Sequence, residues 1–226
     1  MKLSLIIPVY NERGALGPCL ANLAALEGGA EVIFADGGST DGTAEAAAAA
    51  GFRVVACPKG RAAQMNAAAA QAAGEVLWFT HCDSLLPADG PRQILRAAEA
   101  GAEFGCFHIA FDYHGPFMGC NTYFSNRRAR RRHIAFGDQG IFLTRALFQA
   151  VGGFPDLPLM EDYELSRTLR RRGTALHVLP GTILTSGRRY REGGPLRTMA
   201  WMFWLRCLYR AGVDVHRIAR LYRDVR

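Results

Sequence analysis

The stretch Asp36-Gly37-Gly38-Ser39-Thr40-Asp41-Gly42-Thr43 decides the fold class of this chain. It follows the apolar run 32–35 and precedes the alanine-rich run 44–50, so it predicts a turn between a buried strand and a helix. Its glycines allow a tight turn close to a ligand, and Ser39, Thr40 or Asp41 can cap the helix. A strand, an acid and a helix start outline a nucleotide pocket, but Asp-Gly-Gly-Ser is also a common turn.

Strands and helices are predicted to alternate on both sides of this stretch. Strands are expected at 3–9, 32–35, 53–57 and 76–80, and helices at 14–26, 43–50 and 62–73. This order predicts an α/β fold with a Rossmann-like, mostly parallel sheet that carries helices on both faces. Ligands of such sheets bind at the carboxyl ends of the strands. The polar clusters that directly follow strands, 8–12, 36–38 and 81–83, are therefore expected to meet along one edge.

The composition predicts a globular chain with a substantial core, because 226 residues are 50% hydrophobic and 21% charged. No apolar run reaches the roughly 18 residues of a membrane span, and the first apolar segment is too short for a secretory signal. The six cysteines form no Cys-x-x-Cys pair, which argues against a structural zinc site and indicates a reducing, cytoplasmic compartment. A net charge of +7 predicts an anionic partner, such as a nucleotide, a nucleic acid or an acidic membrane surface.

Five motifs, in their order along the chain, resemble the family 2 glycosyltransferases, which are inverting enzymes of GT-A fold that use nucleotide sugars. They are Pro8-Val9-Tyr10-Asn11-Glu12, the 36–43 stretch, Gly60-Arg61-Ala62-Ala63-Gln64-Met65-Asn66, Asp83 and Met160-Glu161-Asp162-Tyr163-Glu164-Leu165. The resemblance implies a GT-A domain over residues 1–190 and an extension of amphipathic helices over 191–226. Segments 60–66 and 137–140 further resemble small soluble bacterial members related to carotenoid-type glycosyltransferases.

The resemblance also assigns the donor-binding residues. The acid at the end of the second strand binds the base in that family, and this role falls on Asp36. Arg61 is expected to reach the base or the diphosphate, because guanidinium pairs well with both. Further donor contacts are implied for Pro8, Tyr10, Glu12, Gly38, Gln64, Asn66, His81, Asp138 and Arg189. From the residues alone, Arg61 can also be a solvated helix start, Tyr10 a core-edge aromatic and Asp138 a turn cap.

A divalent cation, Mn²⁺ or Mg²⁺, is implied at the diphosphate, where it stabilises the charge of the leaving group. Where the family carries an acid-x-acid motif, this chain has His81-Cys82-Asp83. Asp83 matches the metal-binding carboxylate, and His81 replaces the acid that touches ribose or assists the metal. Imidazole suits manganese better than magnesium, so a ligating His81 would favour Mn²⁺. A His81 that is satisfied by neighbouring backbone is the alternative.

Inverting transfer needs a base that removes the acceptor proton as the oxygen attacks the anomeric carbon. Glu161 and Asp162 precede an expected helix over 163–172, where acids are also favoured simply as helix caps. Their match to the catalytic motif of the family makes Asp162 the predicted base and Glu161 its supporting residue.

Two basic segments concern the partners. The run 127–133 lacks the interleaved aromatics of a single-strand platform, so we expect no nucleic acid, but a solvated helix face or contact with anionic lipid. The segment 196–209 combines tryptophan with arginine, which suits a membrane interface or a helix buried beside the acceptor site. We therefore expect a cytoplasmic protein that can bind peripherally to the inner face of the cell membrane.

The leading hypothesis is an inverting, metal-dependent transfer of a single sugar from a UDP-sugar to a lipid-like or small hydrophobic acceptor. Ser186-Gly187-Arg188-Arg189-Tyr190 stands where processive synthases carry Gln-x-x-Arg-Trp, which favours single transfer and brings Arg188 or Arg189 toward the diphosphate. Two alternatives remain. A nucleotidyltransferase would carry a glycine-rich phosphate loop after the first strand, and a non-catalytic polyanion-binding protein would use the arginine run with a degenerate sugar site.

Overall fold

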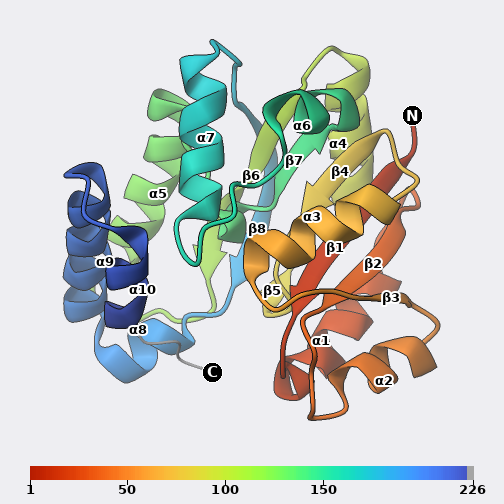
Figure 1. The fold of residues 1–226 in the computed structure, drawn as a ribbon, viewed down its shortest axis with the longest axis horizontal. Coiled ribbons are helices and arrows are strands. Elements are labelled where there is room, and N and C mark those ends of the chain that lie inside the picture. Colours follow the sequence, from red (N-terminus) through yellow and green to blue (C-terminus); the bar gives the residue numbers. More distant parts are fainter. Residues whose placement is uncertain (223–226) are drawn as a thin grey trace.

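A computed structural model describes residues 1–222 of the chain. At its centre lies an eight-stranded sheet with the order β3-β2-β1-β4-β7-β6-β8-β5 (Figure 1). The strands are β1 Leu3–Val9, β2 Glu31–Asp36, β3 Arg53–Ala56, β4 Val76–Phe79, β5 Ser84–Leu85, β6 Phe104–Phe111, β7 Ile141–Thr144 and β8 His177–Thr185.

The first four strands form a parallel half-sheet. β1 pairs in parallel with β2 and β4, and β2 pairs in parallel with β3. Their carboxyl ends therefore share one edge, where Val9 lies opposite Asp36. The other half is mixed, because β7 is antiparallel to β4 and β6, whereas β6 and β8 are parallel. The predicted α/β fold with a mostly parallel sheet is confirmed.

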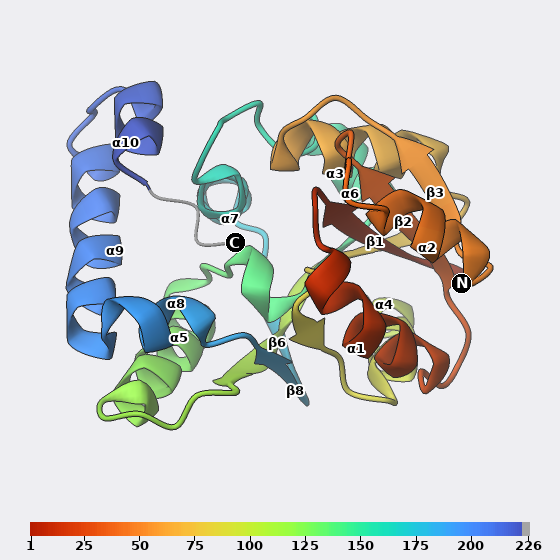
Figure 2. The ribbon, with the colours of Figure 1, turned by 90° about the horizontal axis from the view of Figure 1, so that it is seen from below.

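Helices cover both faces of the sheet, as expected. They are α1 Arg13–Ala24, α2 Thr43–Ala49, α3 Arg61–Gln71, α4 Gly90–Glu99, α5 Met118–Arg132, α6 Arg145–Val151, α7 Glu161–Arg171, α8 Arg188–Gly193, α9 Pro195–Arg210 and α10 Val215–Leu221, with a 3-10 turn, η1, at Gly137–Gln139. Figure 2 shows α3 and α6 on one side of the sheet and α1 and α4 on the other. Alternation along β1 feeds both cores: Ile6 packs with α3, whereas Leu5 and Ile7 pack with α1.

Two residues with left-handed backbone set the starts of the helices that carry candidate site residues. Gly60 has φ 135°, a region open mainly to glycine, and α3 begins at the next residue, Arg61. Met160 has φ 69°, and α7 begins directly after it at Glu161 rather than at the expected residue 163. Both predicted catalytic acids therefore lie inside the first turn of α7.

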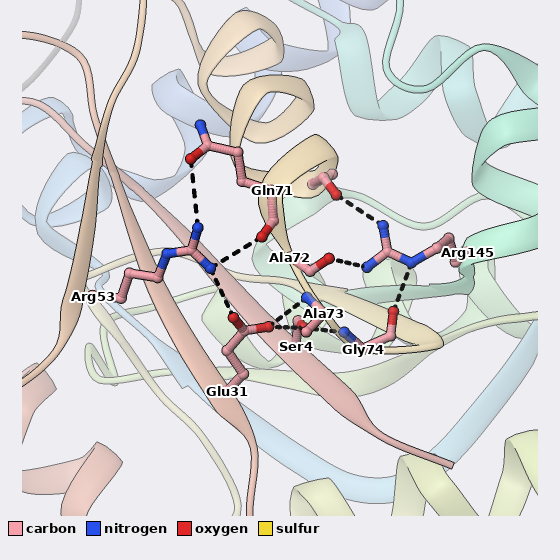
Figure 3. Close-up of polar contacts among 9 residues, drawn as sticks. Ser4, Glu31, Arg53, Gln71, Ala72, Ala73, Gly74 and Arg145 are labelled. Carbon is pink, nitrogen blue, oxygen red and sulfur yellow. Dashed lines mark hydrogen bonds and ion pairs between the residues drawn. The ribbon is translucent and has the colours of Figure 1, made fainter.

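A polar network fixes the far end of α3, away from the carboxyl edge of the sheet (Figure 3). Arg145 donates hydrogen bonds to the carbonyl oxygens of Ala69, Ala72 and Gly74, at 3.0, 2.7 and 2.8 Å. The bonds to Ala69 and Ala72 satisfy carbonyls that the helix end leaves without partners, and the bond to Gly74 fixes the segment that leads to β4. Because its last turn is anchored in this way, α3 presents its first turn at a fixed place on the carboxyl edge.

Helices α8, α9 and α10 form a layer at the left of Figure 1, away from β1 to β3. Leu205 of α9 and Ile218 of α10 are buried against Leu159 and Met160, the two residues before α7. The predicted domain boundary at residue 190 falls inside α8. Within residues 1–222, no helix combines the length and apolar character needed to cross a membrane.

Candidate active site

A cavity of about 530 Å³ opens at the carboxyl edge of the sheet. Its walls come from the ends of β1 and β4, the starts of α3 and α7, η1, the segment after β8, and one side of α9 and α10. The predicted site residues that line it are Pro8, Tyr10, Glu12, Arg61, Gln64, His81, Asp83, Asp138, Glu161, Asp162 and Arg189. The structure thus brings together most of the residues predicted from separate motifs. Asp36, Gly38 and Asn66 are not among the lining residues.

The Asp36 carboxylate holds its own loop. Asp36 is 8% exposed, and its Oδ2 accepts hydrogen bonds from the backbone N–H groups of Gly38 and Ser39 at 2.9 and 3.0 Å. The hydroxyl oxygens of Ser39 and Thr43 accept from the backbone N–H groups of Asn11 and Glu12, both at 3.0 Å. The 36–43 loop therefore shapes the 9–13 segment that borders the cavity. Gly42 stands at the N-cap position of α2, and the Asp41 carboxylate accepts from the first helical N–H, that of Thr43, at 3.0 Å, which confirms the predicted capping by Asp41.

Two amide side chains of α3 hold backbone near the site. Gln64 Nε2 donates to the carbonyl oxygens of Val9 and Ala35, both at 2.7 Å, and so ties β1 to β2 at their ends. Asn66 donates through Nδ2 to the Phe154 carbonyl at 2.8 Å and accepts from the Phe154 N–H at 2.9 Å. Asn66 therefore anchors the loop that leads to the start of α7, outside the cavity wall.

We expect Asn66→Ala to lower the free energy of unfolding by about 1–3 kcal/mol, because both backbone groups of Phe154 lose their partner. UDP affinity should stay within about two-fold, since the side chain does not line the cavity. Urea unfolding and calorimetric titration of UDP measure the two quantities. Gln71→Ala, at the exposed end of the same helix, is the control. A large loss of UDP affinity at unchanged stability would instead make Asn66 a binding residue.

An ion pair joins the starts of α3 and α7 across the cavity. Arg61 Nη1 lies 3.2 Å from Glu161 Oε1, and the Glu161 side chain is only 2% exposed. Burial raises the pKa of Glu161 and Arg61 opposes this rise, while the Glu161 carboxylate raises the pKa of Arg61. The Arg61 side chain stays 45% exposed, so it can also meet an anionic ligand in the cavity.

The Asp162 carboxylate is held by two backbone groups. Its Oδ2 accepts from the Gly137 N–H at 2.7 Å, and its Oδ1 accepts from the Tyr163 N–H at 2.6 Å. A Cβ on Gly137 would lie 2.8 Å from His81 Nε2 and 3.5 Å from Asp162 Oδ2, so only a glycine lets these side chains approach. Because Gly137 has no side chain, His81 after β4 and Asp162 at the start of α7 can both lie close to η1.

Burial controls the charge of the remaining polar side chains. Burial and the nearby Arg61 lower the pKa of His81 to about 3, so its imidazole is neutral at physiological pH. Partial removal from water raises the pKa of the Asp83 carboxyl, and the positive charge of Arg188 opposes this rise. Burial, opposed by Arg128, raises the pKa of Asp138 to about 6. Within the described residues, Asp138 Oδ1 is buried without a hydrogen-bond partner, which suits a ligand hydroxyl.

The donor set fits a cation that is shared with a phosphate. Within residues 1–222, no group of three or more His, Cys, Asp or Glu side chains could hold a metal ion. Asp83 and the neutral His81 offer a carboxylate and an imidazole, so an ion there needs oxygen ligands from elsewhere. Oxygens of a phosphate-bearing ligand would complete such a set.

Several residues in or near the cavity were not predicted from the sequence. Arg128 belongs to the basic run 127–133, yet it donates to Gln139 Oε1 at 2.8 Å and lies 3.6 Å from the centre of the Phe136 ring. Burial lowers the pKa of Arg128 to about 10. The expectation of a solvated face fails for this residue, although residues 130–132 of the run are exposed. Lining residues outside the segments that the sequence analysis singled out include Lys59, Phe111, Phe136 and Tyr222.

Comparison with known proteins adds a family match. The profile described as Glycosyl transferase family 2 matches residues 4–148. No curated protein matches the chain. The mannosyltransferase PcManGT from Pyrobaculum calidifontis, solved with GDP-Man and Mn²⁺, matches with TM-score 0.64 and 19% identity over 89% of this chain and 64% of that one.

Two further solved structures are similar. S. aureus TarS 1-349 with UDP-GlcNAc has TM-score 0.64 and 18% identity, over 82% of this chain and 58% of that one. Glucosyl-3-phosphoglycerate synthase from Mycobacterium tuberculosis with Mn²⁺, UDP and glucosyl-3-phosphoglycerate has TM-score 0.61 and 21% identity, over 94% and 81%. The chain spans less than two thirds of the first two proteins. These similarities confirm a GT-A-like fold, while the resemblance to the carotenoid-type subgroup stays a prediction.

Proposed function

Because this chain belongs to Glycosyl transferase family 2, we propose that it moves a single sugar from a UDP-sugar to a hydrophobic acceptor with inversion at the anomeric carbon. The observation that carries this proposal is the single cavity shared by Arg61, Asp83 and Asp162, from α3, the β4 end and α7. The similar proteins solved with nucleotide sugars, or with UDP and Mn²⁺, support the same ligand class here.

The donor would lie along the carboxyl edge of the parallel half-sheet. Segment 8–12 borders the base and ribose, and Asp36 acts on that side through the loop that it shapes. Arg61 and Arg188 line the same cavity and offer positive charge to the diphosphate. Asp83 and His81 would hold a divalent ion, Mn²⁺ or Mg²⁺, which when bound neutralises charge on that diphosphate.

In the proposed reaction, Asp162 accepts the proton of the acceptor hydroxyl as its oxygen forms a bond to the anomeric carbon. The bond from that carbon to the diphosphate breaks, and UDP leaves with the electron pair. The two backbone hydrogen bonds to Asp162 keep its carboxylate in one orientation. Glu161 positions Arg61, and Asp138 is placed to bind a sugar hydroxyl.

We further propose that the protein works at the cytoplasmic face of a membrane. Trp201, Phe203 and Trp204 of α9 are 42%, 62% and 43% exposed, although such side chains are usually buried. Arginines at positions 197 and 210 flank them on the same helix. Aromatic rings with nearby guanidinium groups suit the headgroup region of an anionic bilayer.

A thermal-shift screen of UDP, GDP and dTDP with Mn²⁺ or Mg²⁺ tests the donor assignment. Ligand at 100-fold its Kd stabilises the native state by about 2.7 kcal/mol, which corresponds to about 5–10 °C in Tm for a chain of this size. We expect this shift for UDP with Mn²⁺ and little shift for GDP or dTDP. Stabilisation by GDP alone would refute the UDP assignment, and no shift with any nucleotide would refute the donor site.

A further inference from the structure

A second cavity, of about 490 Å³, lies beside the catalytic one between α8, α9 and the end of α10. We call it the α9 groove. It shares three lining residues, Arg189, Met202 and Tyr222, with the catalytic cavity. The two spaces are therefore neighbours across these side chains, and the groove has a volume in the range of about 300–1,000 Å³ that small-molecule sites occupy.

The walls of the α9 groove are mostly apolar, in contrast to the charged catalytic cavity. Trp201, Met202 and Leu221 supply most of the apolar side chains. Trp201 and Leu221 are 42% and 43% exposed, so the groove opens to the surface between them. Trp201 also stacks on Trp204, with 4.9 Å between the ring centres, and thus connects the groove to the exposed aromatic face of α9.

A cationic residue marks the boundary between the two cavities. The Arg189 guanidinium lies 4.4 Å from the centre of the Tyr222 ring, and the Arg189 carbonyl accepts from Thr198 Oγ1 at 3.4 Å. Both contacts hold Arg189 where the apolar groove meets the polar cavity. A second arginine, Arg197, and one acid, Glu192, also line the groove, so its charged side chains are two arginines and one carboxylate with a net positive charge. An apolar slot with positive charge at its inner end is complementary to an amphiphile whose head is anionic.

We propose that the α9 groove binds the apolar chain of an anionic, single-chain amphiphile that serves as the sugar acceptor. The head lies at Arg189 and faces the catalytic cavity, and the chain leaves past Trp201 toward the outer face of α9. Removal of each CH₂ group of that chain from water favours binding, so a chain of several carbons supplies most of the affinity. This assignment rests on the proposed function only in naming the amphiphile as acceptor; the binding itself does not.

The fluorescent probe dansylaminoundecanoic acid, kept below its micelle concentration, tests the groove with the full chain and no nucleotide. We expect saturable binding that Trp201→Ala weakens at least ten-fold. Phe203→Ala is the matched control, because Phe203 is an exposed aromatic residue of the same helix that does not line the groove. It should change the Kd less than three-fold. Circular dichroism and UDP affinity should match wild type in both variants.

A second pair of variants tests the groove through charge rather than through lost contact. Leu221→Glu places a carboxylate in the wall and should weaken the probe at least ten-fold, whereas Leu196→Glu, exposed on α9 outside the groove, should not. Equal effects within either pair would overturn the proposal, because binding would then be adsorption to the aromatic face. No saturable binding to wild type would overturn it too.

The outcomes separate the groove from the proposed function. If the probe follows the expected pattern while no nucleotide binds, the groove stands and the sugar-transfer assignment falls. If UDP and Mn²⁺ bind but the two members of either variant pair weaken the probe equally, the donor site stands and the groove assignment falls.

Discussion

Asp162→Asn is expected to lower turnover by about 10²–10⁴-fold while UDP affinity stays within about two-fold of wild type. The amide has nearly the shape of the carboxylate, and its oxygen can still accept one of the two backbone hydrogen bonds. The amide cannot take up the acceptor proton, so only the chemical step is slowed. Release of UDP from the donor sugar, with a membrane lipid extract as acceptor source, measures turnover, and calorimetry measures UDP affinity.

Asp156→Asn is the matched control for this variant. Asp156 is an exposed aspartate in the loop before α7 and does not line the cavity, so its variant should turn over at the wild-type rate. Wild-type turnover in Asp162→Asn would show that another group removes the proton. Loss of UDP binding in that variant would instead make Asp162 a donor-binding residue.

Asp83→Ala is expected to abolish the dependence of UDP affinity on Mn²⁺ and to lower turnover by about 10²–10³-fold. The loss follows from charge on the diphosphate that is no longer neutralised, a contribution of several kcal/mol, at a factor of ten for each 1.36 kcal/mol. Titrations of UDP with Mn²⁺ and with EDTA measure the metal dependence in each protein.

Asp89→Ala serves as the comparison, because Asp89 is exposed before α4 and is not among the residues that line the cavity. It should keep both turnover and the difference between the Mn²⁺ and EDTA titrations. An Asp83→Ala protein that binds UDP more tightly with Mn²⁺ than with EDTA, to the wild-type extent, would refute the metal assignment.

The sequence predicts the carboxyl edge well because strand ends and turn residues are local features. The apolar run 3–9 is a strand with those bounds, and the segments after the first and fourth strands reach the cavity. The same rule gives the right edge for Asp36, but it cannot show that the carboxylate holds its own loop. Which atoms a polar side chain binds depends on loop geometry that residue types do not encode.

Contacts distant in sequence set the roles that were not predicted. Asn66 and Phe154 are 88 residues apart, and only the packing of α3 against the loop before α7 shows that this amide is an anchor. Arg128 lies in a run of arginines, so its sequence context does not distinguish it from Arg127 or Arg130. Only its contact with Gln139 of η1 shows that it has a different role. Helix α9 combines both predicted readings, since Leu205 is buried while Trp201 and Trp204 are exposed.

Crystals grown with UDP and Mn²⁺ offer the most direct test of the donor and metal site, because manganese is located by its anomalous scattering. We predict a manganese peak bound by the Asp83 carboxylate and the diphosphate oxygens, with Arg61 at the diphosphate and the uracil against segment 8–12. A manganese peak away from Asp83, or UDP bound outside the cavity at the carboxyl edge, would contradict the assignment of this cavity as the site of sugar transfer.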